Sequence, residues 1–436
     1  MATPTKDQER LALSRLFHRN GFGPLPGEFE STLRDGFSKS ANKFLLQPSD
    51  SVISSQSSSF SVEELGKRPE PGTFANTEYM ITMRKQIKDM TLWWLDLMVT
   101  TQTPYNEKMT WFWHGHWATS VEKGNFALPM FKQNQTFRKY ALGDFAALSR
   151  AMYNDGALQF WLDGQENTAV APNENLSREF MELFTLGVNR YTEDDVKALA
   201  RVFTGMQVNR GNGKTTFNPK RHDSSPVTLL GTTKSFTADE AIDLLTSRED
   251  CARFIAERMW FRFVSSEHAL PSDFDLSTFG NRNIAELMRS ITFSPYFYNS
   301  NYALVKSPIE WCVGVCRAFG IIPSQVRNPQ QIVNGLSKLA QVPFNPPNVG
   351  GWPAGELWLT SAAAQFRLNL ANLLVKSASL KDLKSVSPSQ RVQYLKNHLG
   401  VYQWSKRTED ALTSAKSDPE RLLLLAINSP EYVVGA

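Results

Sequence analysis

The feature that most constrains this chain is apolar spacing of the α-helical kind, which recurs along most of its length. Within residues 77–101, large apolar side chains fall three or four residues apart, which places them on one face of a helix. The same spacing returns in residues 7–19, 145–153, 175–186, 193–203, 237–264, 283–293, 308–319, 328–340 and 358–381. The sequence therefore predicts a mainly α protein, built as one large multi-helix domain.

Two segments depart from this pattern. Residues 205–236 are rich in Gly, Asn, Thr, Pro and Lys, which predicts a small β-hairpin or a long functional loop. Residues 49–61 are rich in serine, and we expect a loop or a flexible insert there. We assign residues 1–380 to the helical domain, and residues 381–436 to a C-terminal helical extension packed on it.

Charge, cysteine content and hydropathy exclude several classes of protein. The 47 basic and 43 acidic residues form no basic stripe, so no nucleic-acid partner is expected. Three cysteines do not make a disulfide framework. Charges interrupt every apolar stretch well short of a membrane span, and no signal peptide is visible. We expect a cytoplasmic protein of unknown oligomeric state, or an exported protein whose leader has been removed.

The densest chemical feature is the segment Trp113-His114-Gly115-His116-Trp117. A His-x-His pair on an irregular turn aims both imidazoles at one ion, whereas on a regular helix the two rings diverge by about 200°. Gly115 permits such an irregular turn at little steric cost. The aromatic surround would exclude water, which suits a metal ion or a tuned acid/base group. The alternative is a pair of buried histidines bonded to backbone carbonyls.

A second cluster of polar residues lies within residues 172–182. Glu174 would stand at a helix N-terminus, where backbone N–H groups stabilise a carboxylate. Arg178, Glu179 and Glu182 follow within about one turn, and the same helix is strongly apolar. Some of these charges should therefore lie near a core. We name Glu174, Arg178 and Glu179 as candidate catalytic residues, with a surface ion pair as the alternative.

Two shorter motifs follow. In the adjacent pair His222 and Asp223, the carboxylate can orient the imidazole or join it on a metal ion, and a simple turn is the alternative. Ser307 and Glu310 have the spacing of a capping box at the start of a helix. Lys306 immediately precedes this cap and is a candidate for holding an anion.

These clusters, in this order, resemble the motifs of the bacterial family called domain of unknown function 1800. The resemblance is carried by residues 17–24, 113–116, 172–187, 191–193, 222–223, 306–310 and 351–353. It extends from about residue 10 to residue 375. The family brings no settled activity, so the resemblance supports the choice of sites without implying a reaction. Its members are often exported, whereas this chain shows no leader, which favours a pathway-specific cytoplasmic enzyme.

From these motifs we predict a metal-dependent enzyme. His114, His116 and His222 would supply nitrogen ligands, and Glu174 or Asp223 would be a carboxylate ligand or a general base. Such a ligand set with open positions suits Fe, Cu or Zn. The water-poor surround favours an Fe or Cu oxidoreductase acting on a small molecule or peptide in a biosynthetic pathway. Zn-dependent hydrolysis, in which Glu174 activates a metal-bound water, is an alternative.

Two further alternatives need no metal. In the first, His114 and Glu174 carry protons while Arg178 and Lys306 bind an anionic substrate, as in acid/base or transfer catalysis. In the second, the protein is a non-enzymatic binding or scaffold protein that uses the Pro- and Gly-rich loop around Trp352.

Overall fold

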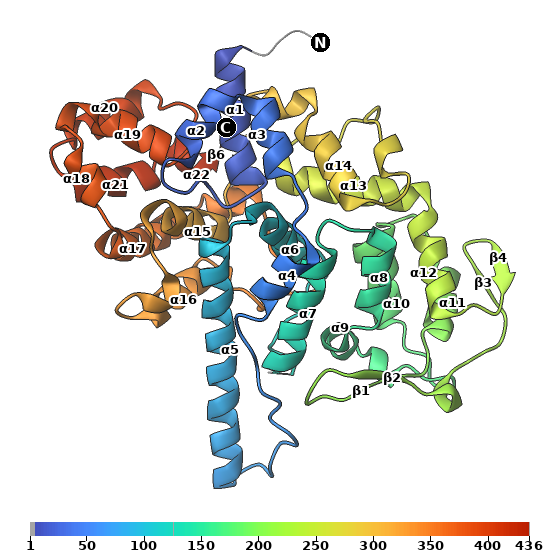
Figure 1. The fold of residues 1–436 in the computed structure, drawn as a ribbon. Coiled ribbons are helices and arrows are strands. Elements are labelled where there is room, and N and C mark those ends of the chain that lie inside the picture. Colours follow the sequence, from blue (N-terminus) through green and yellow to red (C-terminus); the bar gives the residue numbers. More distant parts are fainter. Residues whose placement is uncertain (1–4, 125, 436) are drawn as a thin grey trace.

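Helices make up most of the structure, as the apolar spacing predicts (Figure 1). The computed structural model describes residues 5–124 and 126–435. The helices before the hairpin region are α1 (Lys6–Arg19), α2 (Glu28–Asp35), α3 (Phe37–Phe44), α4 (Asp50–Ser57), α5 (Phe74–Thr100), α6 (Pro104–His116), α7 (Ala127–Tyr140), α8 (Phe145–Tyr153), α9 (Gly156–Trp161), α10 (Asn175–Glu179) and α11 (Glu193–Val202).

The helices after the hairpin region continue the pattern to the end of the described chain. They are α12 (Ala238–Ser247), α13 (Glu249–Phe263), α14 (Ile284–Thr292), α15 (Pro308–Phe319), α16 (Pro329–Lys338), α17 (Ser361–Ser377), α18 (Lys381–Ser385), α19 (Arg391–His398), α20 (Lys406–Ser414), α21 (Pro419–Ile427) and α22 (Pro430–Val433). None of the helices in the described residues is both long and apolar enough to span a lipid bilayer.

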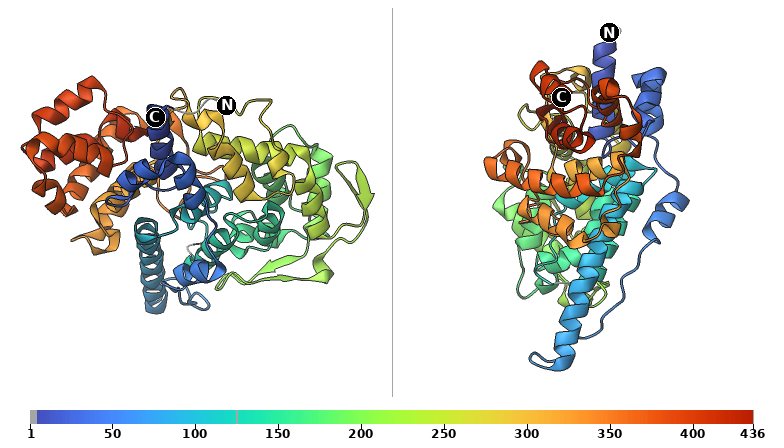
Figure 2. Two further views of the ribbon diagram at one scale, coloured as in Figure 1. Left: turned by 45° about the horizontal axis from the view of Figure 1, so that its top comes forward. Right: turned by 90° about the vertical axis from the view of Figure 1, so that its left-hand side faces the viewer.

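The strands form small antiparallel pairs. The pairs are β1 (Met206–Val208) with β2 (Thr215–Phe217), β3 (Val227–Leu229) with β4 (Thr232–Lys234), and β5 (Leu304–Val305) with β6 (Val434–Gly435). The first two pairs are hairpins within residues 205–236, which confirms the prediction for that region. The third pair joins two segments that are far apart in the sequence, and it brings the end of the described chain beside α1 (Figures 1 and 2).

Local sequence signals set several helix starts. Thr192 and Ser307 each accept the backbone N–H of the third residue into the helix, and Asp195 and Glu310 complete the two capping boxes. The serine-rich segment differs from the expected loop, because it contains α4. The Gln56 side-chain amide in α4 donates hydrogen bonds to hydroxyl groups that lie 45 and 47 residues away in the chain. Such contacts are not visible in the local composition.

The buried apolar side chains form two clusters, with α6 between them. The first core joins residues of α1, α3, α8 and α11–α14, and the second core joins residues of α5, α15–α17 and α19–α21. Met109 and Trp113 of α6 belong to the first core, whereas Trp111 belongs to the second. In Figure 1 the helices of the second core lie largely to the left of α6, and α8 and α11–α14 lie to its right. The motif predicted to carry chemistry therefore lies on the helix that separates the two cores.

Candidate functional site

The two histidines of the His-x-His pair lie on a regular α-helix. Because α6 runs through His116, two residue steps turn the second ring by about 200° from the first. The His114 ring packs against Trp94 and Phe344 in the second core, with centroids 5.1 and 5.4 Å apart. The His116 ring packs against Trp113 in the first core, at 5.4 Å. The two imidazoles thus enter different cores.

Gly351 permits a close approach between its loop and α6 at Gly115. Gly351 has a φ of +81°, and a Cβ atom at this residue would lie 2.3 Å from the carbonyl oxygen of Gly115. A side chain there would push the loop away from α6. With glycine at position 351, Trp352 stacks on Trp111 with centroids 4.9 Å apart. The expectation of an irregular turn at Gly115 is therefore wrong, because α6 is helical through His116, and a Cβ atom at Gly115 would make only an ordinary contact of 3.8 Å with Trp352.

Each histidine makes a hydrogen bond to a backbone group. His116 donates from Nε2 to the carbonyl oxygen of Phe184 at 2.9 Å, at the end of the π-helical segment Phe180–Thr185. Carbonyls in a last helical turn have no partner in their own helix, so this bond satisfies one of them. His114 accepts the backbone N–H of Phe344 at Nε2, also at 2.9 Å. Burial lowers the pKa of both imidazoles to about 3, so both are neutral near pH 7.

The other predicted metal ligands lie in separate surroundings. His222 has Nδ1 3.1 Å from the carbonyl and hydroxyl oxygens of Thr204. Asp223 accepts a hydrogen bond from Arg201 at 2.7 Å, which lowers the pKa of this carboxyl group to about 2. Across the part of the chain that the structure describes, no group of three or more His, Cys, Asp or Glu side chains could hold one metal ion. The structure does not bring the predicted ligands together, and metal dependence stays a prediction.

The predicted acidic cluster lies at the protein surface. Arg178 donates two hydrogen bonds of 2.7 Å to Glu193 and one of 3.1 Å to Glu174. Burial, with a contribution from nearby Glu182, raises the pKa of the half-buried Glu179 carboxyl group. The structure thus brings Glu174 and Arg178 together as predicted. The arrangement matches the alternative of a surface ion pair, and none of these side chains lines either cavity described below.

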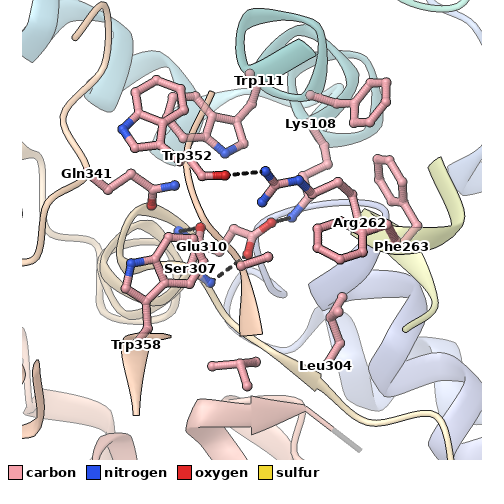
Figure 3. Close-up of a pocket in the computed structure, with 15 residues that line it drawn as sticks. Lys108, Trp111, Arg262, Phe263, Leu304, Ser307, Glu310, Gln341, Trp352 and Trp358 are labelled. Atoms are coloured by element: carbon pink, nitrogen blue, oxygen red, sulfur yellow. Dashed lines mark hydrogen bonds and ion pairs between the residues drawn. The ribbon is translucent and has the colours of Figure 1, made fainter. Parts of the chain in front are cut away.

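A cavity of about 50 Å³ opens beside α6, between the two cores (Figure 3). This volume holds a few water molecules or a small polar group. Aromatic rings and charged groups both line it, and the residues that matter most here are Trp111, Trp352, Trp358, Lys108, Arg262 and Glu310. Trp352, which we expected in a binding loop, is thus buried in this wall.

An ion pair between Lys108 and Glu310 borders the cavity (Figure 3). The two side chains are 4% and 16% exposed. Glu310 also accepts the backbone N–H of Ser307 at 2.8 Å, as part of the capping box of α15. Burial pushes the pKa of Glu310 upward, but the Lys108 ammonium and the hydrogen bonds from Ser307 together outweigh burial and hold that pKa below its usual value. Burial lowers the pKa of Lys108, which makes its ammonium a readier proton donor.

Further hydrogen-bond donors surround the same cavity. Arg262 donates to the backbone carbonyls of Trp352 and Pro353 at 2.6 and 3.2 Å. The indole N–H groups of Trp352 and Trp358 are buried and have no acceptor within the described residues. A buried donor without a partner costs free energy. Lys108, Arg262 and Glu310 therefore bring two cations and one carboxylate to the cavity, and the two unpaired indole N–H groups are buried in its wall.

Comparison with known proteins assigns the chain to a family. The model of the family described as "Protein of unknown function (DUF1800)" matches residues 15–434. The chain belongs to the DUF1800 family. No curated protein and no solved structure matches it. The family match includes residues 381–434, which we expected to lie beyond the family domain.

Some residues of the site in this DUF1800 protein were not found from sequence. Lys108 and Arg262 were missed, and Glu310 was assigned only a capping role. A signal for Lys108 did exist, because it stands beside Glu107 within the strongly aromatic segment 105–117. Charged side chains in such a segment are buried only when they have partners. The partners themselves could not be read from the sequence.

Proposed function

We propose that this DUF1800 protein is an enzyme of the acid/base or transfer type that acts on a small anionic molecule beside Lys108. The observation that carries the proposal is the Lys108–Glu310 ion pair, which is nearly buried and yet borders a cavity. A pair that served stability alone would need neither this space nor the second cation, Arg262, that lines it.

The lining suggests a role for each group. Arg262 would bind the anionic group of the substrate. The tryptophan rings would exclude water, which strengthens these interactions. Lys108 would donate a proton to the substrate, and Glu310, as a carboxylate, would accept one. Lys108 and Glu310 thus take the proton-transfer roles that we expected for His114 and Glu174, since the latter two residues do not line the cavity.

Anion binding tests this proposal. Acetate or phosphate should raise the Tm of the wild-type protein and change its tryptophan fluorescence. Lys108→Met should weaken binding about tenfold because one cation is lost. Glu310→Gln should strengthen it, because Glu310 is the only carboxylate among the described residues that line the cavity. Arg201→Met is the matched control, since Arg201 is also ion-paired but lies outside the cavity. Equal anion responses in all four proteins would contradict the proposal.

The metal-dependent oxidoreductase predicted from the histidine pair is a second, separate proposal. One observation favours it: Nδ1 of His116 is buried and has no hydrogen-bond partner within the described residues, so its lone pair is unused. Elemental analysis of the purified protein tests this proposal. Stoichiometric Fe, Cu or Zn that disappears in His116→Ala and His114→Ala would support it. A metal-free preparation with full activity would contradict it.

A further inference from the structure

A second cavity, of about 20 Å³, lies behind Glu310. Leu304 and Glu310 line both cavities, so the two are adjacent. His18 and Lys306 line the second cavity, and neither has a role in the function proposed above. The volume is enough for one or two water molecules or for one small functional group of a ligand.

The Lys306 amine is buried at this cavity without a conventional partner. Its Nζ lies 3.7 Å from the centroid of the Tyr432 ring. Within the described residues this amine forms neither an ion pair nor a hydrogen bond. Lys108, by contrast, is ion-paired with Glu310. A buried lysine that serves stability alone is normally paired with a carboxylate, whereas the contact of Lys306 within the described residues is the face of the Tyr432 ring, and this arrangement calls for another explanation.

The surroundings favour the uncharged form of this amine. Burial lowers the pKa of Lys306 well below its usual value. The Lys108 ammonium acts in the same direction, and Glu310 acts against it. The unprotonated amine is the form that attacks a carbonyl carbon, and buried lysines are used in this way to form Schiff bases.

We propose that Lys306 forms an imine with a small anionic carbonyl compound such as a 2-oxo acid. This inference rests on the proposed function, because the carboxylate of the compound would lie in the first cavity where it adjoins the second, and the carbonyl carbon bonded to it would meet the Lys306 amine. The adjacency of the two cavities across Glu310 and Leu304 supports this placement.

The proposed step is balanced and needs no oxidant or reductant. The nitrogen of Lys306 bonds to the carbonyl carbon, and a proton moves from nitrogen to oxygen to give a carbinolamine. The carbon–oxygen bond then breaks, and the oxygen leaves as water with a proton supplied by the Lys108 ammonium. The nitrogen loses its remaining proton to Glu310, which leaves a neutral imine. The Lys108–Glu310 ion pair thus gives one proton and takes one.

Reductive trapping of the full chain tests the inference. The protein is incubated near neutral pH with glyoxylate and cyanoborohydride, which reduces an imine to a stable secondary amine. Peptide mass spectrometry then locates the added carboxymethyl groups. Lys306 should be labelled about tenfold more than the exposed Lys376, because a larger fraction of its amine is unprotonated. Excess acetate should reduce this label.

Variants and controls separate the possible outcomes. Lys306→Arg should abolish the label and Lys376→Arg should leave it unchanged, and labelling in the wild type stays informative if Lys306→Arg does not fold. Equal labelling of Lys306 and Lys376 would overturn the proposal that Lys306 forms an imine. If acetate still stabilises the protein in a Lys108-dependent way, the proposed function survives that result. A label at Lys306 that acetate does not reduce would overturn the placement of the carboxylate in the first cavity.

Discussion

Glu107 and Lys108 are neighbours on α6, yet their ion pairs lie in different surroundings. Glu107 pairs with Arg138 at 2.6 Å, both side chains are fully buried, and the Trp94 indole N–H donates to the same carboxylate at 2.5 Å. Lys108 pairs with Glu310 at the edge of a cavity. One residue step on a helix turns the side chain by about 100°, so adjacent residues enter different environments.

The comparison separates charges that hold the fold from charges that a ligand can reach. At the enclosed pair, loss of one partner leaves a charge in the core with no access to water. At the cavity pair, water or a ligand can compensate for such a loss. The Glu107–Arg138 and Lys108–Glu310 ion pairs are both largely buried. The cavity beside Lys108 and Glu310 is what distinguishes them.

The largest expected effect is at the enclosed pair. Glu107→Ala should lower the free energy of unfolding by about 3–5 kcal/mol, because Arg138 would be left buried and uncompensated. Urea unfolding monitored by circular dichroism measures this loss. Glu310→Ala, at the cavity pair, is the comparison variant and should lower the free energy of unfolding clearly less than Glu107→Ala does. A similar loss of unfolding free energy in the two variants would show that the cavity does not compensate for an unpaired charge.

A third buried acid, Asp155, shows the effect of burial without a cation. It accepts hydrogen bonds from the Gln133 side chain and the Leu158 N–H at 2.7 and 2.8 Å, but burial still raises the pKa of Asp155 to about 7. Its protonated form therefore stabilises the fold below about pH 4, and this contribution is lost as the pH rises to about 7, by roughly 1 kcal/mol per pH unit.

The variant Asp155→Asn should remove that pH dependence, because the amide does not ionise and can still cap α9. Urea unfolding at several pH values measures the difference between the wild type and the variant. The variant should gain stability relative to the wild type as the pH rises. A constant difference across this range would show that Asp155 is already ionised in the folded protein at acidic pH.

Substitutions at the Lys108–Glu310 pair should change the free energy of unfolding less than substitutions at the Glu107–Arg138 pair. They should change anion binding more. Glu310→Gln should cost about 1–2 kcal/mol of unfolding free energy, since the amide can still accept the backbone N–H of Ser307. Thermal unfolding with and without acetate measures both properties. Anion binding that stays unchanged in this variant would argue that Glu310 does not face the ligand.

The smallest effect is expected at the surface cluster. Arg178→Ala should change the free energy of unfolding by no more than about 1 kcal/mol, because its ion pairs with Glu174 and Glu193 are exposed and screened by salt. Anion binding in the cavity should not change. Loss of enzymatic activity in this variant, once a reaction is known, would restore this cluster as a candidate site.

Sequence reasoning succeeded where the determining contacts are local. The capping box at Ser307 spans three residues, and the helical spacing repeats within single turns. It failed where partners lie far apart: the Phe344 N–H that binds His114 is 230 residues away, and Lys108 and Glu310 are 202 residues apart. The pair His114 and His116 therefore suggested a metal site, whereas the three-dimensional packing gives each ring a backbone partner.

The pairing of β5 with β6 has a consequence for how the site is assembled during synthesis. Tyr432 and Gly435 border the Lys306 region, and the Lys306 backbone N–H bonds to the carbonyl of Val433. A nascent chain that has already folded α6 and α15 still lacks this wall until residues 432–435 emerge from the ribosome. The Lys306 amine thus acquires its buried environment late, which would delay its reactivity until the rest of the domain is in place.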